Sequence, residues 1–191
     1  MRHLVLAILG IAIFSGCGEA IRSADEERAM VLRYKPKHNF EFRENRIALV
    51  IGNGDYQNIT GLDNPTNDSR AMRKKLSKLG FEIVYLVNGT RKEMKNSIRK
   101  FQTEFKKKKN VVALFYYAGH GLESGGINYL IPVNANIKEE DEIDDEAVSL
   151  NFMLEKFEVS GNRLNIAILD SCRDNPFRGL RNVKGGLGIH L

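Results

Sequence analysis

Two apolar stretches of this chain each lead to one side chain that can take part in covalent chemistry. Residues 111–117 lead to His120, and residues 164–169 lead to Cys172. Both stretches are apolar almost throughout, which is typical of strands buried on both faces of a parallel sheet. Because the carboxyl ends of parallel strands gather at one edge, where ligand sites form, we expect His120 and Cys172 to meet there.

A cysteine beside a histidine is the pair that a cysteine hydrolase requires. A free thiol has a pKa of ~8.5, so an imidazole must accept its proton before the sulfur can attack a carbonyl carbon. The same imidazole can then protonate the leaving amine. The resulting oxyanion needs backbone N–H donors, and glycine lets the main chain approach a substrate closely. We therefore expect the amides of Gly121 and Cys172 to form an oxyanion hole.

Each member of the pair also has a purely structural interpretation. Cys172 could be a small buried hydrophobic residue, and His120 could be a loop histidine with local hydrogen bonds. The residues at positions 170, 171, 173 and 174 are all polar, which favours a polar edge for the cysteine. The matching position of His120 at the end of another strand favours the catalytic interpretation.

The elements that would position this pair alternate in the order of a doubly wound α/β domain. Apolar runs predict strands at residues 46–51, 81–87, 111–117 and 164–169, and a hairpin around the glycine pair at 125–126. Helical spacing of apolar residues predicts helices at residues 67–79, 90–108 and 150–157. Thr66 or Asn67 would cap the first helix, and Thr90 with Glu93 has the spacing of a capping box for the second.

The first residues have the layout of a secretory signal. A basic start precedes an apolar run at residues 4–14, and small residues follow before Cys17. The run is shorter than the ~20 residues that a membrane span needs. Residues 14–17 resemble a bacterial lipobox, in which the cysteine is acylated and attaches the protein to a membrane. The alternative is ordinary cleavage near Ala20, which would release a soluble exported protein.

The chain therefore divides into three predicted regions: a signal peptide at residues 1–20, a charged tether at 21–45 and a folded domain at 46–191. We expect an exported protein, either on the periplasmic side of a bacterial membrane as a lipoprotein or secreted. A length of 191 residues with 42% hydrophobic residues suits one globular domain with appendages.

Composition argues against several other classes. The net charge of +5 derives partly from lysines 106–109, which would complement the dipole at a helix end, and no aromatic-and-basic alternation indicates nucleic-acid binding. No His/Cys cluster has zinc spacing, and the glycines at 52–54 lack the third glycine of a dinucleotide site. The acidic stretch 139–146 matches no EF-hand, so we expect no cofactor, with calcium activation as the alternative.

Several motifs, in this order along the chain, resemble those of caspase-like cysteine peptidases, and particularly of bacterial caspase-domain proteins related to metacaspases. They lie at residues 48–53, 67–68, 116–121, 128–132 and 170–177. The Ser-Cys-Arg-Asp sequence around Cys172 differs from the Gln-Ala-Cys pattern of animal caspases. The resemblance implies a caspase-like three-layer α/β fold, with a mostly parallel central sheet flanked by helices.

The resemblance also implies a function: an endopeptidase that acts on polypeptides, with His120 and Cys172 as its dyad. Asp68 and Asp170 match acidic positions that bind the basic residue before the cut, and carboxylates in a pocket select Arg or Lys. Asp55 is a weaker candidate for the same pocket. Locally, Asp68 could instead be a helix N-terminal charge and Asp170 a strand-ending residue.

Family members continue past the cysteine with further strands that complete the sheet and help to form the substrate cleft. We expect these C-terminal strands to be missing here. The alternative to an enzyme is thus a catalytically inactive caspase-fold module for interaction or regulation.

Overall fold

A computed structural model describes residues 3–8, 44–171, 175–177, 180 and 183–187 of the chain. All of them belong to one compact unit, which comprises residues 1–10 and 44–191. Its centre is a parallel five-stranded sheet with the strand order β1-β8-β4-β2-β3. The strands are β1 (His3–Ile8), β2 (Asn45–Gly52), β3 (Glu82–Val87), β4 (Val111–Gly119) and β8 (Leu164–Ser171).

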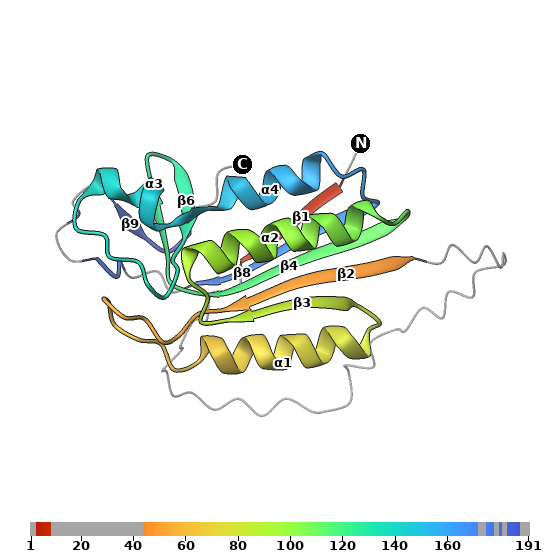
Figure 1. Cartoon of the computed structure of the whole chain (residues 1–191), viewed down its shortest axis with the longest axis horizontal. Coiled ribbons are helices and arrows are strands. Elements are labelled where there is room, and N and C mark those ends of the chain that lie inside the picture. Colours follow the sequence, from red (N-terminus) through yellow and green to blue (C-terminus); the bar gives the residue numbers. More distant parts are fainter. Residues whose placement is uncertain (1–2, 9–43, 172–174, 178–179, 181–182, 188–191) are drawn as a thin grey trace, which may run out of the picture. The chain divides into compact units, whose positions relative to one another are not determined.

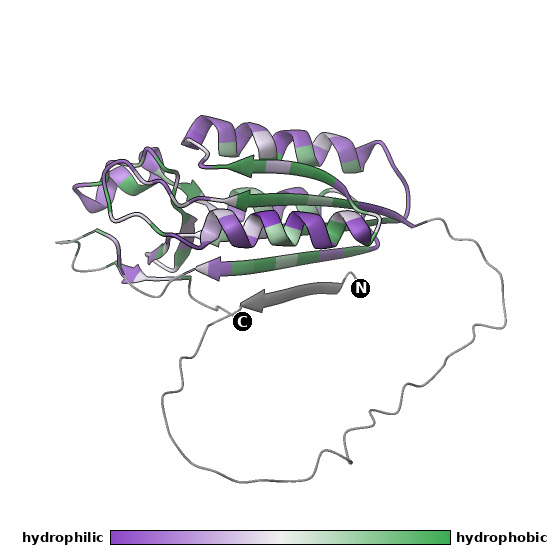
Figure 2. Ribbon diagram, turned by 90° about the horizontal axis from the view of Figure 1, so that it is seen from below, coloured by the Kyte–Doolittle hydropathy of each residue, from purple (hydrophilic) through white to green (hydrophobic). Residues whose placement is uncertain are grey.

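Helices cover both faces of this sheet and make a three-layer fold (Figure 1). On one face lies α1 (Pro65–Lys78), and on the other lie α2 (Arg91–Lys106) and α4 (Leu150–Glu158). The strands are predominantly hydrophobic, and the helices are mostly hydrophilic outside the positions that face the sheet (Figure 2). The mostly parallel sheet flanked by helices, which the sequence predicts, is therefore confirmed.

The main core lies between the sheet and the pair of helices α2 and α4. Phe101 is fully buried there, with its ring centroid 5.0 Å from that of Phe105 and 6.1 Å from that of Phe157. Both contacts are edge-to-face, the geometry that aromatic quadrupoles favour. Burial of each such ring contributes about 1.5–3 kcal/mol. The central strand β4 is buried along its whole length, so the packing on both of its faces positions its carboxyl end at Gly119.

A second, antiparallel sheet follows directly at the carboxyl end of β4. Its strand order is β7-β6-β5-β9, and it has its own hydrophobic cluster. Its strands are β5 (Gly121–Ser124), β6 (Ile127–Leu130), β7 (Val148–Ser149) and β9 (Lys184–Gly185). Only His120 separates β4 from β5, so this residue joins the two sheets.

The predicted elements agree with the structure except in three places. The capping box of Thr90 and Glu93 at the start of α2 is present. The cap predicted for α1 at Thr66 or Asn67 is wrong: α1 begins at Pro65, after Asn64. Proline is favoured in the first turn because it has no N–H to satisfy there.

The second difference is the acidic stretch 139–146, where no helix was predicted: it contains a 3₁₀ turn (Glu140–Glu142) and a short helix, α3 (Ile143–Glu146). The Glu142 carboxylate accepts the backbone amides of Lys138 and Glu139, and these bonds lower its pKa below the usual range. Acidic side chains at the start of a helix satisfy N–H groups that have no partner within the helix. These bonds explain why so acidic a segment can be ordered.

The third difference concerns the N-terminal residues. His3–Ile8 form β1, whose backbone pairs in parallel with Leu164–Leu169 of β8. A short apolar run is compatible both with a signal segment and with a strand, because periodicity alone does not separate a strand from a helical segment. The signal peptide at 1–20 stays a prediction, and Cys17 lies outside the described residues. No helix in the described part of the chain is long and apolar enough to span a membrane.

Candidate active site

The two strands that lead to the predicted dyad lie side by side and end together. β4 and β8 are parallel neighbours, and their last aligned pair is Gly119 with Ser171. His120 follows the first of these residues and Cys172 the second. A Cβ atom at Gly121 would lie 3.4 Å from Cβ of Ser171, so the chain just after His120 also lies against the end of β8. Cys172 itself lies outside the described residues.

His120 is only 5% exposed, and its ring is anchored by a main-chain group. Its Nε2 atom lies 2.9 Å from the carbonyl oxygen of Thr60, in the loop between β2 and α1. A carbonyl can only accept a hydrogen bond, so Nε2 carries a hydrogen. In the neutral ring, Nδ1 is therefore the nitrogen that can accept a proton. The Thr60 carbonyl also stabilises the imidazolium, because it continues to accept from Nε2 when the ring is charged.

Two tyrosines hold the main chain of His120. The His120 amide donates to the hydroxyl of Tyr56 at 2.7 Å, and the Tyr117 hydroxyl donates to the His120 carbonyl at 2.6 Å. The Tyr56 ring also packs against the imidazole, with 4.7 Å between the ring centroids. Complete burial, and then the neighbouring Tyr56, hold the pKa of Tyr117 well above its usual range. Tyr117 therefore stays protonated and can donate.

Gly119 makes this arrangement of phenols sterically feasible. A Cβ atom there would lie 2.7 Å from the hydroxyl oxygens of both Tyr117 and Tyr56, and the φ angle is +152°. Residues that carry a side chain rarely adopt that backbone conformation. Glycine is thus required immediately before His120.

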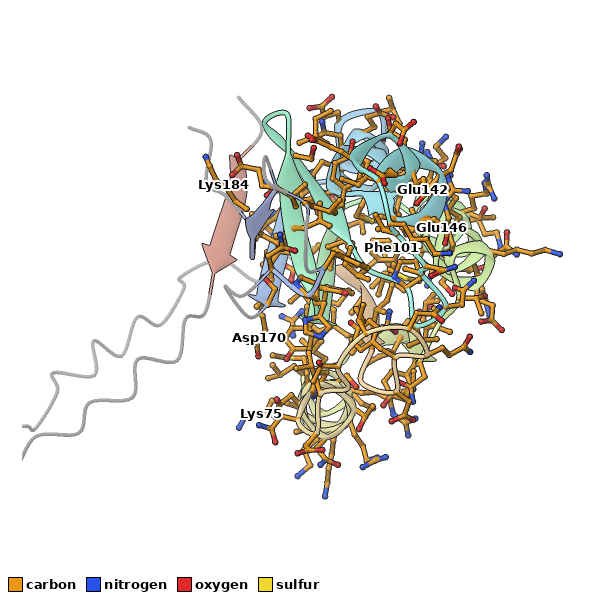
Figure 3. All side chains as sticks on the ribbon, turned by 90° about the vertical axis from the view of Figure 1, so that its left-hand side faces the viewer. Lys75, Phe101, Glu142, Glu146, Asp170 and Lys184 are labelled. Atoms are coloured by element: carbon orange, nitrogen blue, oxygen red, sulfur yellow. The ribbon has the colours of Figure 1, made fainter. Side chains whose placement is uncertain are left out.

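Two of the predicted acidic residues interact at the neighbouring strand end. Asp170 lies near the end of β8, where the hydroxyl of Tyr116 donates to its Oδ2 atom at 3.3 Å. Burial, and then the negative charge of Asp68, raise the pKa of Asp170 above its usual range, against the opposing effect of the Tyr116 bond. Asp68 is exposed in the first turn of α1. Figure 3 views the molecule from this end of the parallel strands and labels Asp170.

Asp55 makes a different contact. Its carboxylate accepts a hydrogen bond from the side-chain amide of Asn88. The Asn88 side-chain oxygen accepts in turn from the amides of Gly54 and Asp55. These bonds tie the loop after β2 to the loop after β3. Asp55 is exposed, and its carboxylate stabilises this connection between loops. We call the other two residues, Asp68 and Asp170, the acidic cluster.

Gly121, the predicted oxyanion donor, lies in β5 and is buried. Its carbonyl accepts from the Gly186 amide, and a Cβ atom on Gly121 would lie 2.7 Å from a methyl carbon of Leu187. The segment around β9 therefore packs directly against this glycine. The roles of the Gly121 and Cys172 amides stay predictions.

Asn53 is a residue whose role the sequence does not reveal. It is fully buried, its side-chain oxygen accepts from the Gly89 amide, and its side-chain nitrogen donates to the Ile131 carbonyl. Its own amide donates to the Ala118 carbonyl. Asn53 thus joins the ends of β2 and β4 to two loops around the site. Its position after an apolar run was visible in the sequence, but its partners are distant along the chain.

The acidic segment is engaged in local contacts. Among the described residues, no group of three or more His, Cys, Asp or Glu side chains is arranged to hold a metal ion. Glu142 and Glu146, labelled in Figure 3, accept backbone amides, and the Tyr129 hydroxyl donates to Asp144 at 2.7 Å. Calcium activation stays a prediction.

Comparison with known proteins agrees with this fold and defines its class. A family model described as "Caspase domain" matches residues 45–186, and the chain therefore belongs to the caspase domain family of peptidases.

Two relatives illustrate the similarity. Over 130 residues the chain is 32% identical to human "Mucosa-associated lymphoid tissue lymphoma translocation protein 1" and, equally, to its mouse homolog. Each match covers 68% of this chain but 15% of the relative, so the chain spans only a small part of these curated proteins.

Proposed function

We propose that this chain is a cysteine endopeptidase that cuts polypeptides after Arg or Lys, with Cys172 as nucleophile and His120 as general base and acid. The supporting observation is the register of β4 and β8, in which Gly119 pairs with Ser171. The two residues that follow this pair are a histidine and a cysteine. Membership of the caspase domain family, whose substrates are polypeptides, agrees with this assignment.

The chemistry follows from the anchored imidazole. Nδ1 of His120 takes the proton of the Cys172 thiol, and the thiolate attacks the carbonyl carbon of the scissile bond. The amides of Gly121 and Cys172 would donate to the oxyanion. His120 then gives its proton to the leaving amine, and a thioester remains on the sulfur. Attack by water, with the proton again taken by His120, releases the acid and restores the thiol.

The acidic cluster supports the proposed preference for basic residues. Burial, and then the negative charge of Asp68, raise the pKa of Asp170. A guanidinium or ammonium group bound between them would relieve that repulsion and form charge-assisted hydrogen bonds. A substrate ending in Asp would instead add a third negative charge.

One observation favours the alternative of an inactive caspase-fold module. Leu187 packs against Gly121, beside the place where the oxyanion donor is proposed. In this arrangement Leu187 fills space beside Gly121 that a bound substrate would need. Such a chain would bind partners through its surface and hydrolyse nothing.

Labelling of the full chain with an arginyl peptide chloromethyl ketone separates these functions. We expect labelling at Cys172 and cleavage of Arg-ending but not Asp-ending fluorogenic peptides, assayed with and without calcium. Cys172→Ala should abolish labelling and lower turnover by about 10³-fold or more. Cys17→Ser is the matched control, since these are the only two cysteines of the chain, and it should label normally. A folded wild-type chain that neither labels nor cleaves would favour the module.

For the N-terminal residues we propose export directed by residues 1–20, with acylation of Cys17 and attachment to the periplasmic side of a bacterial membrane. Cleavage near Ala20 and secretion is the alternative. The support is the sequence pattern alone.

A further inference from the structure

We propose that Tyr56 is a positioning residue that fixes the tautomer and orientation of the His120 imidazole. This inference rests on the proposed role of His120 as the general base. Tyr56 contacts His120 twice, since its hydroxyl accepts the His120 amide at 2.7 Å and its ring packs 4.7 Å from the imidazole. It therefore acts on both the main chain and the side chain of the proposed base.

The loop that carries Tyr56 is itself fixed to the antiparallel sheet region. The Gln57 amide donates to the Val133 carbonyl at 2.8 Å, and the Asn58 side chain donates to the Ala135 carbonyl at 3.1 Å. Tyr56 also packs against the hydrophobic cluster of that region. These hydrogen bonds hold the two residues that follow Tyr56 in the chain. A residue held in this way can impose an orientation on its neighbour rather than follow it.

The hydroxyl of Tyr56 supplies an acceptor where the sheet ends. His120 is the single residue between β4 and β5, and its amide donates to this phenol. The carbonyl of the same residue accepts from Tyr117. Both peptide groups that flank the Cα atom of His120 are therefore fixed by phenols. Loss of the Tyr56 acceptor would remove this hydrogen bond from the His120 amide, which is costly, and the backbone would turn toward another acceptor.

The rotation of that backbone would be transmitted to the ring. Nε2 of His120 lies 2.9 Å from the Thr60 carbonyl oxygen, and this bond selects the tautomer with the hydrogen on Nε2. Thr60 lies in the same loop as Tyr56. A shift of His120 relative to the Tyr56 phenol would therefore also change its distance to the Thr60 carbonyl. Without Tyr56 the ring would populate both tautomers, and in the second one Nδ1 carries a hydrogen and cannot act as the base.

The test uses the full chain labelled with ¹⁵N-histidine, in which His120 is recognised as the signal that His120→Gln removes. We expect wild type to show the Nε2–H tautomer. Tyr56→Phe keeps the ring but removes the acceptor, and it should show a mixture of both tautomers. In the peptidase assay we expect kcat to fall about tenfold while KM changes less than twofold, because Tyr56 does not contact the substrate.

Tyr85→Phe is the matched control, since it removes a phenol that contacts Ser69 elsewhere in the fold. It should leave both the tautomer and kcat unchanged. A Tyr56→Phe chain with the wild-type tautomer and wild-type kcat would overturn the proposal. If Tyr56→Phe does not fold, 3-fluorotyrosine at position 56 weakens the acceptor without changing its shape, and an unshifted His120 amide proton resonance would then reject it.

The readouts also keep the two proposals apart. A wild-type chain with no peptidase activity would refute the proposed function, while the tautomer of His120 in the two Tyr56 forms would still decide the role of Tyr56. An active wild type with an unaffected Tyr56→Phe variant would refute only the role of Tyr56.

Discussion

The side chains of His120 and Asp170, at the adjacent ends of β4 and β8, have opposite electrostatic requirements. The imidazole must be able to gain a charge, and the Thr60 carbonyl accepts a hydrogen bond from the ring in either state. The Asp170 carboxylate must keep its charge although burial and Asp68 oppose it. A bound cation would stabilise the charged form of this carboxyl group, so cation binding and the ionisation of Asp170 are linked.

Asp170→Asn should separate binding from stability. We expect KM for Arg-ending peptides to rise about tenfold, because a charge-assisted hydrogen bond is lost. The free energy of unfolding at pH 7 should be equal to or higher than that of wild type, since the repulsion with Asp68 disappears. Urea unfolding and steady-state kinetics measure the two effects.

The difference in stability between wild type and Asp170→Asn should depend on pH, and the raised pKa of Asp170 gives the direction of that change. The pKa of Asp170 is raised in the folded state, so the wild type binds this proton more tightly when folded than when unfolded. Wild type should therefore gain stability relative to Asp170→Asn as the pH falls through the raised pKa toward the ordinary value of about 3.9. Over the same range, Arg binding by the wild type should weaken. A difference in stability that does not change with pH would contradict the assignment.

At the scale of elements, local sequence signals decide how well each boundary can be predicted. The start of α2 is marked by Thr90 and Glu93, whose reciprocal hydrogen bonds need only three residues of spacing. Thr90→Ala should lower the free energy of unfolding by about 1 kcal/mol. Thr103→Ala, which removes a hydroxyl bonded to the Arg99 carbonyl inside the same helix, should cost less. Urea denaturation compares the two; an equal loss would mean that the cap contributes nothing special.

The strands and the site edge could be predicted because they depend on patterns that are local or generic. Apolar runs identify β2, β4 and β8, and parallel strands necessarily end at one edge, so the positions of His120 and Asp170 followed from the sequence. The supports of His120 could not be predicted in this way. Tyr56 and Thr60 reach it from a loop about sixty residues earlier, and only the folded chain brings such distant groups together.

The boundaries that were predicted wrongly have local causes. At α1 a polar residue was expected to cap the helix, yet Pro65 starts it because its ring favours helical backbone angles. In the acidic segment, carboxylates that bind backbone amides make helix formation favourable, which composition alone does not indicate.

At the scale of the whole molecule, the N-terminal residues have two competing roles: a signal peptide in the proposed export, and strand β1 in the folded chain. In the full chain, β1 forms the partner of the outer edge of β8. If the residues of β1 are removed on export, whether the chain is cut before Cys17 or near Ala20, that edge loses its partner. An unpaired edge strand exposes N–H and C=O groups that can pair with other chains.

A chain of residues 21–191 should therefore be less stable than the full chain, by more than about 1 kcal/mol, and should associate at high concentration. Urea unfolding and light scattering of both forms measure these effects. Equal stability and a monomeric state at all concentrations would mean that β1 contributes little to the folded domain.

The position of His120 between two sheets has a mechanical consequence. Because one residue alone joins β4 to β5, the torsion angles of His120 set the direction in which the antiparallel sheet leaves the parallel one. A substitution that changed those angles would therefore displace β5 and the imidazole together, because both leave the parallel sheet through the same residue.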